Sequence, residues 1–165
     1  MKKVGIVMGS DSDLPVVQKA ADQLKALGIP FEMHVFSAHR TPEAARNFSA
    51  NAAAGGFGVL IAAAGKAAHL AGALAANTAL PVIGIPVKAS TLDGLDALLS
   101  TVQMPSGVPV AAVAIDGAQN AALLAAQILA VGDSALYEKL TALRREAAEK
   151  VLAKDKEISA RFSSF

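Results

Sequence analysis

The sequence predicts an α/β protein built as a three-layer α/β/α sandwich, with a five-stranded parallel sheet and a long C-terminal helix. Five short runs are rich in apolar residues, and the first of them, residues 4–8, is apolar on both faces, which is typical of a strand buried in a parallel sheet. A short connection after each run leads to a segment with helical spacing, and repeated strand–helix units place helices on both faces of such a sheet. A charged C-terminal segment with one narrow apolar stripe predicts the long helix.

The first half of the chain supplies three strands and three helices. We expect strands at residues 4–8, 31–36 and 58–62. We expect helices at residues 15–27, 42–54 and 66–77. Gly28 ends the first helix, while Thr41 and Pro42 suit the N-cap and the first position of the second.

The second half supplies two more strands, at residues 81–86 and 108–114, and helices at residues 91–101 and 118–131. With right-handed connections, these units predict a flavodoxin-like sandwich. No linker, low-complexity stretch or internal repeat divides the chain, so we expect a single domain over residues 1–165.

The last segment, residues 133–165, is expected to be one long helix over residues 134–162. Its apolar residues recur at helical spacing and form one narrow stripe, made of Leu136, Leu140, Leu143, Ala147 and Val151. The stripe has two equally supported interpretations: the helix packs on its own domain, or it packs on a neighbouring subunit.

Composition excludes several classes of function. The 165 residues include no cysteine, which excludes disulfides, thiolate nucleophiles and Cys-bound zinc. A net charge of +1 and 4% aromatic residues argue against a nucleic-acid partner. No basic segment precedes an apolar stretch, so we expect no signal peptide and a cytoplasmic location.

The chain is 53% hydrophobic, with a mean hydropathy of +0.44. The most apolar stretch, residues 59–76, is interrupted by Gly65, Lys66 and His69, whereas a membrane span needs about 20 mostly apolar residues. We therefore expect no membrane partner. Apolar surface buried between subunits explains the excess, so we expect a homo-oligomer.

Ligands of open α/β sheets bind outside the carboxyl ends of the strands. The segments that follow the first four expected strands are rich in small, hydroxylic, basic and imidazole residues. They are residues 9–13, 37–42, 64–69 and 87–91. Because these segments lie far apart in the sequence, their convergence on one sheet edge is the main evidence for a site.

The first of these segments suits an anion, because Gly9 allows close backbone approach and Ser10 and Ser12 offer hydroxyls where a helix begins. It is neither a Walker loop nor a G-x-G-x-x-G fingerprint. The alternative interpretation is that residues 10–13 only cap the helix. Asp13 is poorly suited to a phosphate but can accept hydrogen bonds from ribose hydroxyls.

Arg40 carries a planar cationic group that suits phosphate oxygens, although a surface salt bridge is the alternative. His39 is the candidate general acid/base at this edge, because a histidine exchanges protons near neutral pH. Structural roles remain the alternative for His39 and for His69. The three histidines lack metal-site spacing, and without a G-x-S-x-G motif a serine hydrolase is not expected.

Several segments together resemble the N5-carboxyaminoimidazole ribonucleotide mutase family of purine biosynthesis. They include Gly9-Ser10-x-Ser12-Asp13, Ser37-Ala38-His39-Arg40-Thr41-Pro42 and Ala67-Ala68-His69-Leu70. The resemblance continues through residues 81–87, 92–96, 102–110 and 120–126, in order and over most of the chain. The S-A-H-R-T-P segment combined with Q-M-P-x-G-V-P is highly specific.

The resemblance implies an isomerase that uses neither cofactor nor metal and moves a carboxylate from the exocyclic nitrogen of an aminoimidazole nucleotide to the adjacent ring carbon. By matching position, His39 is the general acid/base of decarboxylation and carbon dioxide recapture. The implied substrate-binding residues are Ser10, Ser12, Asp13, Ser37, Ala38, Arg40, Ala64, Gly65, Lys66, His69 and Leu70. The resemblance also implies a homo-octamer whose C-terminal helices embrace neighbouring subunits.

Two alternatives stay open. The family pattern G-A-G-G-A-A-H-L-P-G departs here at Ala63, Ala71 and Lys66, and the lysine adds a charge beside the expected pocket. A related branch that carboxylates aminoimidazole ribonucleotide directly has Arg at this place, in A-G-R-S-N, but lacks His69. His69 thus favours the mutase over the carboxylase. The other alternative is a non-catalytic nucleotide-binding module.

Overall fold

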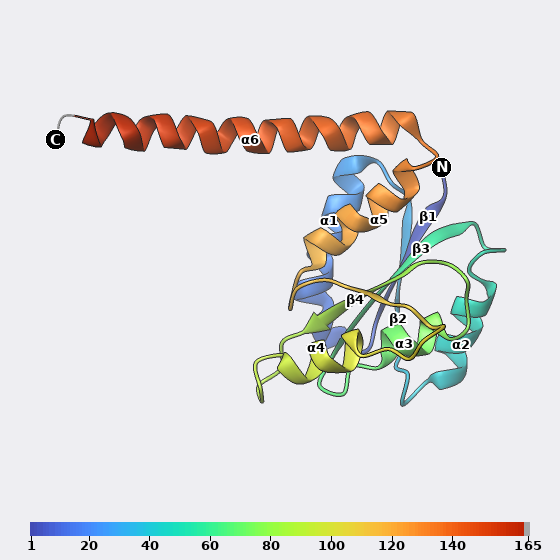
Figure 1. Cartoon of the computed structure of the whole chain (residues 1–165). Coiled ribbons are helices and arrows are strands. Elements are labelled where there is room, and N and C mark those ends of the chain that lie inside the picture. Colours follow the sequence, from blue (N-terminus) through green and yellow to red (C-terminus); the bar gives the residue numbers. More distant parts are fainter. Residues whose placement is uncertain (164–165) are drawn as a thin grey trace.

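A computed structural model describes residues 1–163 and confirms the five-stranded parallel sheet (Figure 1). Its strands are β1 (Lys3–Met8), β2 (Phe31–Val35), β3 (Phe57–Gly65), β4 (Val82–Val87) and β5 (Ala111–Ala112). All neighbouring strands pair in parallel, in the order β2-β1-β3-β4-β5. The chain leaves β1 toward one side for β2 and returns to the other side for β3, so the order reverses between β1 and β3.

Helices cover both faces of the sheet, as the three-layer prediction requires (Figure 1). One face packs against α1 (Leu14–Leu27) and α5 (Ala118–Ala130). The opposite face packs against α2 (Pro42–Asn51), α3 (Leu70–Ala75) and α4 (Leu95–Val102). A single 3₁₀ turn, η1 (Asp11–Asp13), joins β1 to α1.

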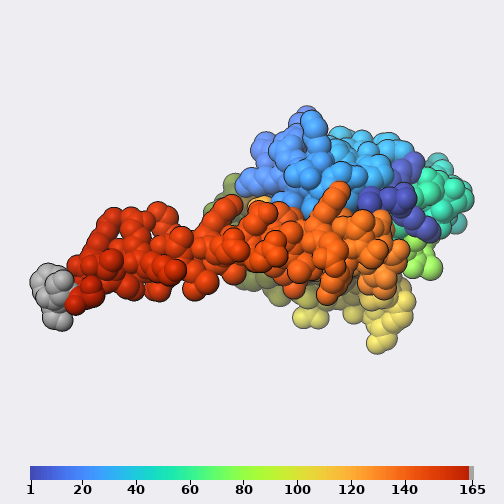
Figure 2. All heavy atoms as spheres, turned by 90° about the horizontal axis from the view of Figure 1, so that it is seen from above, coloured from blue at the N-terminus to red at the C-terminus, as the bar shows by residue number. Residues whose placement is uncertain are grey.

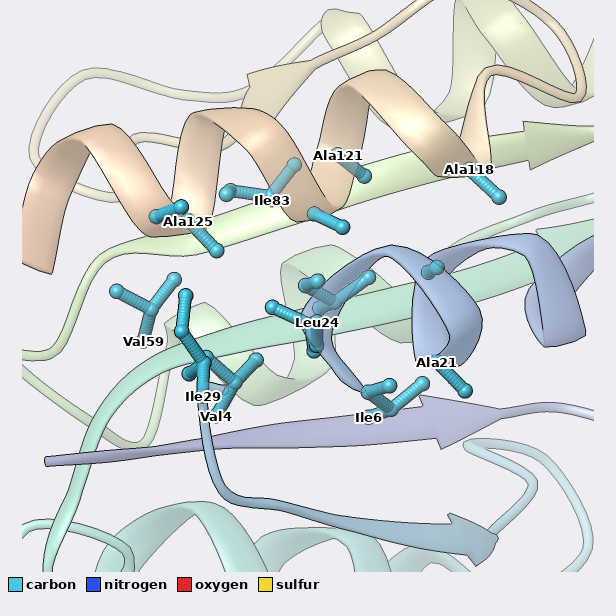
Figure 3. Packing of buried hydrophobic residues seen from close by; sticks show 14 of the residues in the cluster. Val4, Ile6, Ala21, Leu24, Ile29, Val59, Ile83, Ala118, Ala121 and Ala125 are labelled. Carbon is cyan, nitrogen blue, oxygen red and sulfur yellow. The ribbon is translucent and has the colours of Figure 1, made fainter. Parts of the chain in front are cut away.

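The core follows from the alternation of side chains along the strands. Val4 and Ile6 of β1 lie beneath α1 and α5, whereas Val7 points to the opposite layer. Figure 3 shows Leu24 of α1 enclosed by the sheet and α5, whose small Ala121 lies close to α1. A fully buried leucine such as Leu24 contributes about 1.5–3 kcal/mol to stability by leaving water.

The opposite layer is packed so tightly that β4 has room only for glycine at position 84. A Cβ atom on Gly84 would lie 2.3 Å from Thr101 Cγ2 of α4 and 3.2 Å from the Ala71 Cβ of α3. Two helices therefore approach the strand directly over its backbone.

Three predicted boundaries are wrong, each for a local reason. Strand β5 pairs only over Ala111–Ala112 instead of residues 108–114, because Pro109 has no N–H to donate to the ladder. Helix α2 ends at Asn51, and the turn that follows reaches Gly56 with φ +84°. Strand β3 is longer than predicted, from Phe57 to Gly65.

Helices α3 and α4 begin later than residues 66 and 91, where we expected them. Lys66 has φ 57°, and Leu92, Asp93 and Gly94 have φ values of 55°, 51° and 91°. This left-handed conformation cannot continue into a right-handed helix. Helix α3 therefore begins at Leu70 and α4 at Leu95.

Helix α6 (Ser134–Phe162) matches its predicted bounds, and the Asp133 carboxylate caps it by accepting a hydrogen bond from Leu136 N at 3.0 Å. Only its first turns pack on the domain, where Leu136 and Leu140 are buried. The remainder projects away from the sandwich (Figures 1 and 2). Of the helices within residues 1–163, none has both the length and the apolar character needed to cross a membrane.

Candidate active site

A cavity of about 750 Å³ lies at the carboxyl ends of β1, β2, β3 and β4. This is the edge at which the strand order reverses between β1 and β3, where open α/β sheets bind their ligands. All the predicted site residues line it: Ser10, Ser12, Asp13, Ser37, Ala38, His39, Arg40, Ala64, Gly65, Lys66, His69 and Leu70. The structure thus brings the four strand-end segments together, while the role of each residue stays a prediction.

The segment after β1 forms a reciprocal cap. Ser10 Oγ accepts a hydrogen bond from Ser12 N at 3.3 Å, and Asp13 Oδ2 accepts one from Ser10 N at 3.2 Å. The capping interpretation of residues 10–13 therefore agrees with the structure. The cap does not preclude binding, because the Ser10 and Ser12 hydroxyls, 2.9 Å apart, remain in the cavity wall.

Asp13 is 8% exposed and is the only carboxylate that lines the cavity in the described part of the chain. Burial raises the pKa of Asp13 above its ordinary value of 3.8, the hydrogen bond from Ser10 N lowers it, and the charge of Asp11 adds to the rise. Asp13 is thus held by the backbone at the cavity floor, where its free oxygen can face a ligand.

The segment after β2 is held by its own hydroxyls. Thr41 Oγ1 accepts a hydrogen bond from Ser37 N at 2.8 Å and donates one to Ser37 O at 3.2 Å. Thr41 is therefore the N-cap residue of α2 by position, but its side chain closes this turn instead of capping the helix. Ser37 Oγ accepts from Arg40 N at 3.1 Å, which makes the turn compact.

Arg40 joins the second segment to the first. One of its terminal nitrogens donates a hydrogen bond to Gly9 O at 3.2 Å. The guanidinium group has four further N–H donors in its planar fork. Arg40, Ser10 and Ser12 therefore form one group of donors at the β1 end of the cavity, which we name the donor cradle.

His39 and His69 come from different loops and touch. The Nδ1 atom of His69 lies 2.9 Å from Nε2 of His39, and the ring centroids are 4.6 Å apart. A hydrogen bond at this distance requires one nitrogen to carry hydrogen and the other to accept it. His69 is the N-cap residue of α3, so the start of that helix positions one ring and the turn after β2 the other.

The loops after β3 and β4 contribute two lysines. Lys88 Nζ forms an ion pair with Asp93 Oδ1 at 2.9 Å, and this partner raises the pKa of Lys88. The Lys88 backbone N–H also donates to Asp116 Oδ1 at 2.9 Å. Lys66 takes part in none of the ion pairs formed within residues 1–163.

Some lining residues were not in the predicted set of catalytic and substrate-binding residues. They are Gly9, Val16, Ala67, Val87, Lys88 and Ala89. Lys88 and Ala89 directly follow a strand, so the strand-end rule was enough to find them. Val16 lies in the first turn of α1 and carries no sequence signal of its own.

Two other cavities lie between α5 and α6 and contain none of the predicted site residues. Their volumes are about 810 and 640 Å³. Both are lined by Leu140 and Arg144 of α6. Within residues 1–163, no group of three or more His, Cys, Asp or Glu side chains is placed to hold a metal ion.

Comparison with known proteins gives the following relatives. The family model described as AIR carboxylase matches residues 3–150. An N5-carboxyaminoimidazole ribonucleotide mutase from Pyrococcus horikoshii is 54% identical over 155 residues, which are 94% of this chain and 88% of that protein. Phosphoribosylaminoimidazole carboxylase from Saccharomyces cerevisiae is 53% identical over 151 residues, or 92% of this chain and 26% of that protein. The crystal structure of Treponema denticola PurE has a TM-score of 0.86 and 30% identity, covering 93% of this chain and 96% of that one.

Proposed function

The chain belongs to the AIR carboxylase family, and we propose on that premise that it is an N5-carboxyaminoimidazole ribonucleotide mutase of purine biosynthesis. One observation carries the proposal: a single cavity holds both a histidine pair and a donor cradle. Two relatives that are named mutases are 54% and 53% identical to this chain over 94% of its length. The enzyme is thus an isomerase acting on a small nucleotide.

The reaction exchanges one carboxylate for one proton within the nucleotide. The bond between the exocyclic nitrogen and the carboxylate carbon breaks, carbon dioxide leaves, and the nitrogen takes up a proton. The adjacent ring carbon then attacks carbon dioxide, a carbon–carbon bond forms, and that ring carbon loses its proton. Atoms and charge balance without an oxidant or reductant, so the protein has to supply proton transfer and confinement.

His39 is the group that removes the proton from the ring carbon and returns one to the nitrogen. Its hydrogen bond with His69 leaves one of the two facing nitrogens carrying hydrogen and the other accepting it, and holds both rings in place before the substrate binds. His69 thus acts as a positioning residue for His39. General acid–base help of this kind contributes about 10²- to 10⁴-fold to rate.

The rest of the nucleotide fits the cavity from end to end. The donor cradle of Ser10, Ser12 and Arg40 holds the phosphate, and the buried Asp13 accepts hydrogen bonds from the ribose. Ser37, Ala38, Ala64, Gly65 and Leu70 line the wall around the base. Confinement by small residues such as Ala64 keeps carbon dioxide near the ring until it is recaptured.

Direct carboxylation of aminoimidazole ribonucleotide is the second candidate. It is supported by the similarity to the Saccharomyces cerevisiae carboxylase and by a cation, Lys66, at the cavity wall. His69 argues for the mutase, because the related branch that carboxylates aminoimidazole ribonucleotide directly, with Arg in A-G-R-S-N, lacks this histidine.

A label-retention assay separates these two reactions. The carbamate nucleotide, with ¹³C in its carboxylate, is turned over in unlabelled bicarbonate, and aminoimidazole ribonucleotide is turned over separately in labelled bicarbonate. A mutase keeps the ¹³C in its product and acts slowly on the second mixture. Loss of the label together with efficient turnover of the second mixture would establish the carboxylase instead.

We also propose that the chain assembles as a homo-octamer through α6, with the single domain of residues 1–165 as the repeating unit. Beyond its first turns, α6 exposes Val151, Leu152, Ile158 and Phe162, each between 55% and 68% exposed. We name these four the outer apolar residues of α6. We propose that a second copy of this chain covers them, and the two cavities between α5 and α6, whose linings mix apolar and polar residues, are candidate places for the neighbour's helix.

Charging the outer apolar residues is expected to break this assembly. The double variant Val151→Glu with Ile158→Glu places two charges seven residues apart on one helical face. We expect analytical ultracentrifugation to show smaller species than the unaltered octamer, because carboxylates do not enter an apolar interface unpaired. Lys156→Glu, an exposed position on α6 that lines neither of these cavities, is the matched control, and an unchanged mass in the double variant would show that α6 does not hold the subunits together.

We place the enzyme in the cytoplasm. Its substrate is a free nucleotide, and a chain without cysteine gains nothing from an oxidising compartment.

A further inference from the structure

Lys66 occupies a backbone conformation that favours glycine. It follows the last residue of β3, has φ 57°, and its carbonyl accepts a hydrogen bond from Ala68 N at 2.8 Å. A lysine in this left-handed region carries backbone strain that glycine would avoid. Strain of this kind persists where the side chain has a function, and it clusters at ligand sites.

The position of Lys66 separates it from the other strained residues. Within residues 1–163, the non-glycine residues with positive φ are Lys66, Leu92, Asp93 and Asp116. Of these four, Lys66 alone lines the cavity. Asp93 and Asp116 already have local roles, since both hold Lys88.

Among the lysine and arginine residues that line the cavity, Lys66 is the one whose side chain has no partner described within residues 1–163. Arg40 donates to Gly9 O, and Lys88 is paired with Asp93. Lys66 forms no ion pair within residues 1–163. It lies three residues before His69, on the loop that supplies the histidine end of the cavity, whereas the donor cradle lies at the β1 end.

A carboxylated nucleotide carries two anionic groups, and the cavity offers positive charge at two places. The phosphate matches the donor cradle. The proposed function puts the carboxylate, which is attached to the base, at the histidine end of the cavity, and Lys66 is a lining residue on the loop that supplies His69.

We propose that Lys66 binds the carboxylate of the nucleotide and so makes this site selective for carboxylated over uncarboxylated ligands. This inference rests on the proposed function. The ammonium group favours the substrate and the product, which carry the carboxylate, over the intermediate with neutral carbon dioxide. Lys66 therefore strengthens binding at both ends of the reaction and does not itself speed bond cleavage.

Calorimetric titration with two nucleotides tests the proposal. Aminoimidazole ribonucleotide and 4-carboxy-5-aminoimidazole ribonucleotide are each titrated into the unaltered protein, Lys66→Met, Lys66→Gly and Lys66→Arg. We expect the Met and Gly variants to bind the carboxylated nucleotide about 10-fold more weakly and the uncarboxylated one equally well. Lys66→Arg keeps the positive charge, so its Kd for the carboxylated nucleotide stays within about threefold of that of the unaltered protein.

Kinetics and stability give independent readouts. KM for the carbamate nucleotide rises in the Met variant while kcat does not fall, because Lys66 stabilises the carboxylated ground state at least as much as the transition state. Lys66→Gly raises the melting temperature by about 2–4 °C through relief of strain. The matched control is Lys25→Met, in the last turn of α1 at the opposite end of the sheet. We expect it to leave the Kd for each of the two nucleotides unchanged.

The failures of the two proposals are distinguishable. If the unaltered protein binds neither nucleotide, the proposed function is wrong. If it binds both, and Lys66→Met weakens both equally or neither, the role given to Lys66 is wrong while the proposed function stands.

Discussion

Replacing His39 with Asn is expected to lower kcat by about 10²- to 10⁴-fold, with the Kd for the product nucleotide changed by less than about threefold. Asparagine keeps a polar group of similar size but cannot take and return a proton at neutral pH. The donor cradle does not depend on the imidazole, so the nucleotide still binds. Single-turnover kinetics measure the loss, and calorimetry measures the affinity.

His34→Asn is the matched control for this result. His34 lies on β2, stacks on Phe36 with ring centroids 5.1 Å apart, and does not line the cavity. Its replacement is expected to leave kcat unchanged. Full turnover by the His39 variant would show that His39 is not the general acid/base, whereas nucleotide binding without turnover by the unaltered protein would support a non-catalytic nucleotide-binding module.

Replacing Arg40 with Ala is expected to weaken binding of the phosphorylated nucleotide by about 10- to 100-fold, the loss of a charge-assisted hydrogen-bonded contact. The unphosphorylated nucleoside serves as the comparison ligand. Because the proposed role of Arg40 is to bind the phosphate, the variant should lose affinity for the nucleotide while its Kd for the nucleoside stays nearly unchanged.

The Arg40 side chain also links two loops through Gly9 O, so the melting temperature has to be measured alongside affinity. Arg46→Ala, an exposed position on α2 outside the cavity, is the control for the loss of a positive charge. If Arg40→Ala binds the phosphorylated nucleotide as tightly as the unaltered protein, the donor cradle does not hold the phosphate.

The strands were the easiest elements to predict, because burial on both faces leaves a continuous apolar run. Residues 58–62 and 81–86 were found for this reason, and so was the layer order. The predicted starts of α3 and α4 were wrong because left-handed residues such as Lys66 and Asp93 have no compositional signature. A lysine or an aspartate in a helical window looks like a helical residue until its φ is known.

The composition of the site was predictable, and its internal contacts were not. The strand-end rule placed His39 and His69 at one edge of the sheet, since both follow parallel strands. Sequence could not show that the two rings meet at 2.9 Å, because this depends on two loop conformations at once. The reciprocal cap of Ser10 and Asp13 could be foreseen as one of two interpretations, since its spacing is local.

The amphipathic stripe of the last helix left two interpretations open, and the structure shows packing on the domain for the first part of the stripe only. Leu136 and Leu140 pack on the domain, whereas Val151 remains exposed. A repeat of apolar residues specifies that a face is buried, but it does not specify which chain buries it.

The outer half of helix α6 is stabilised by interactions within the helix itself and does not depend on a covering surface. Ion pairs along its own surface join Lys154 and Arg161 to Glu157, at 3.0 and 2.7 Å, and its outer turns are rich in Ala, Lys, Glu and Arg, the strong helix formers. A helix of 29 residues spans about 43 Å. A newly made chain therefore presents this segment as a helix that is already formed. Such a helix loses little backbone conformational entropy when it binds another surface.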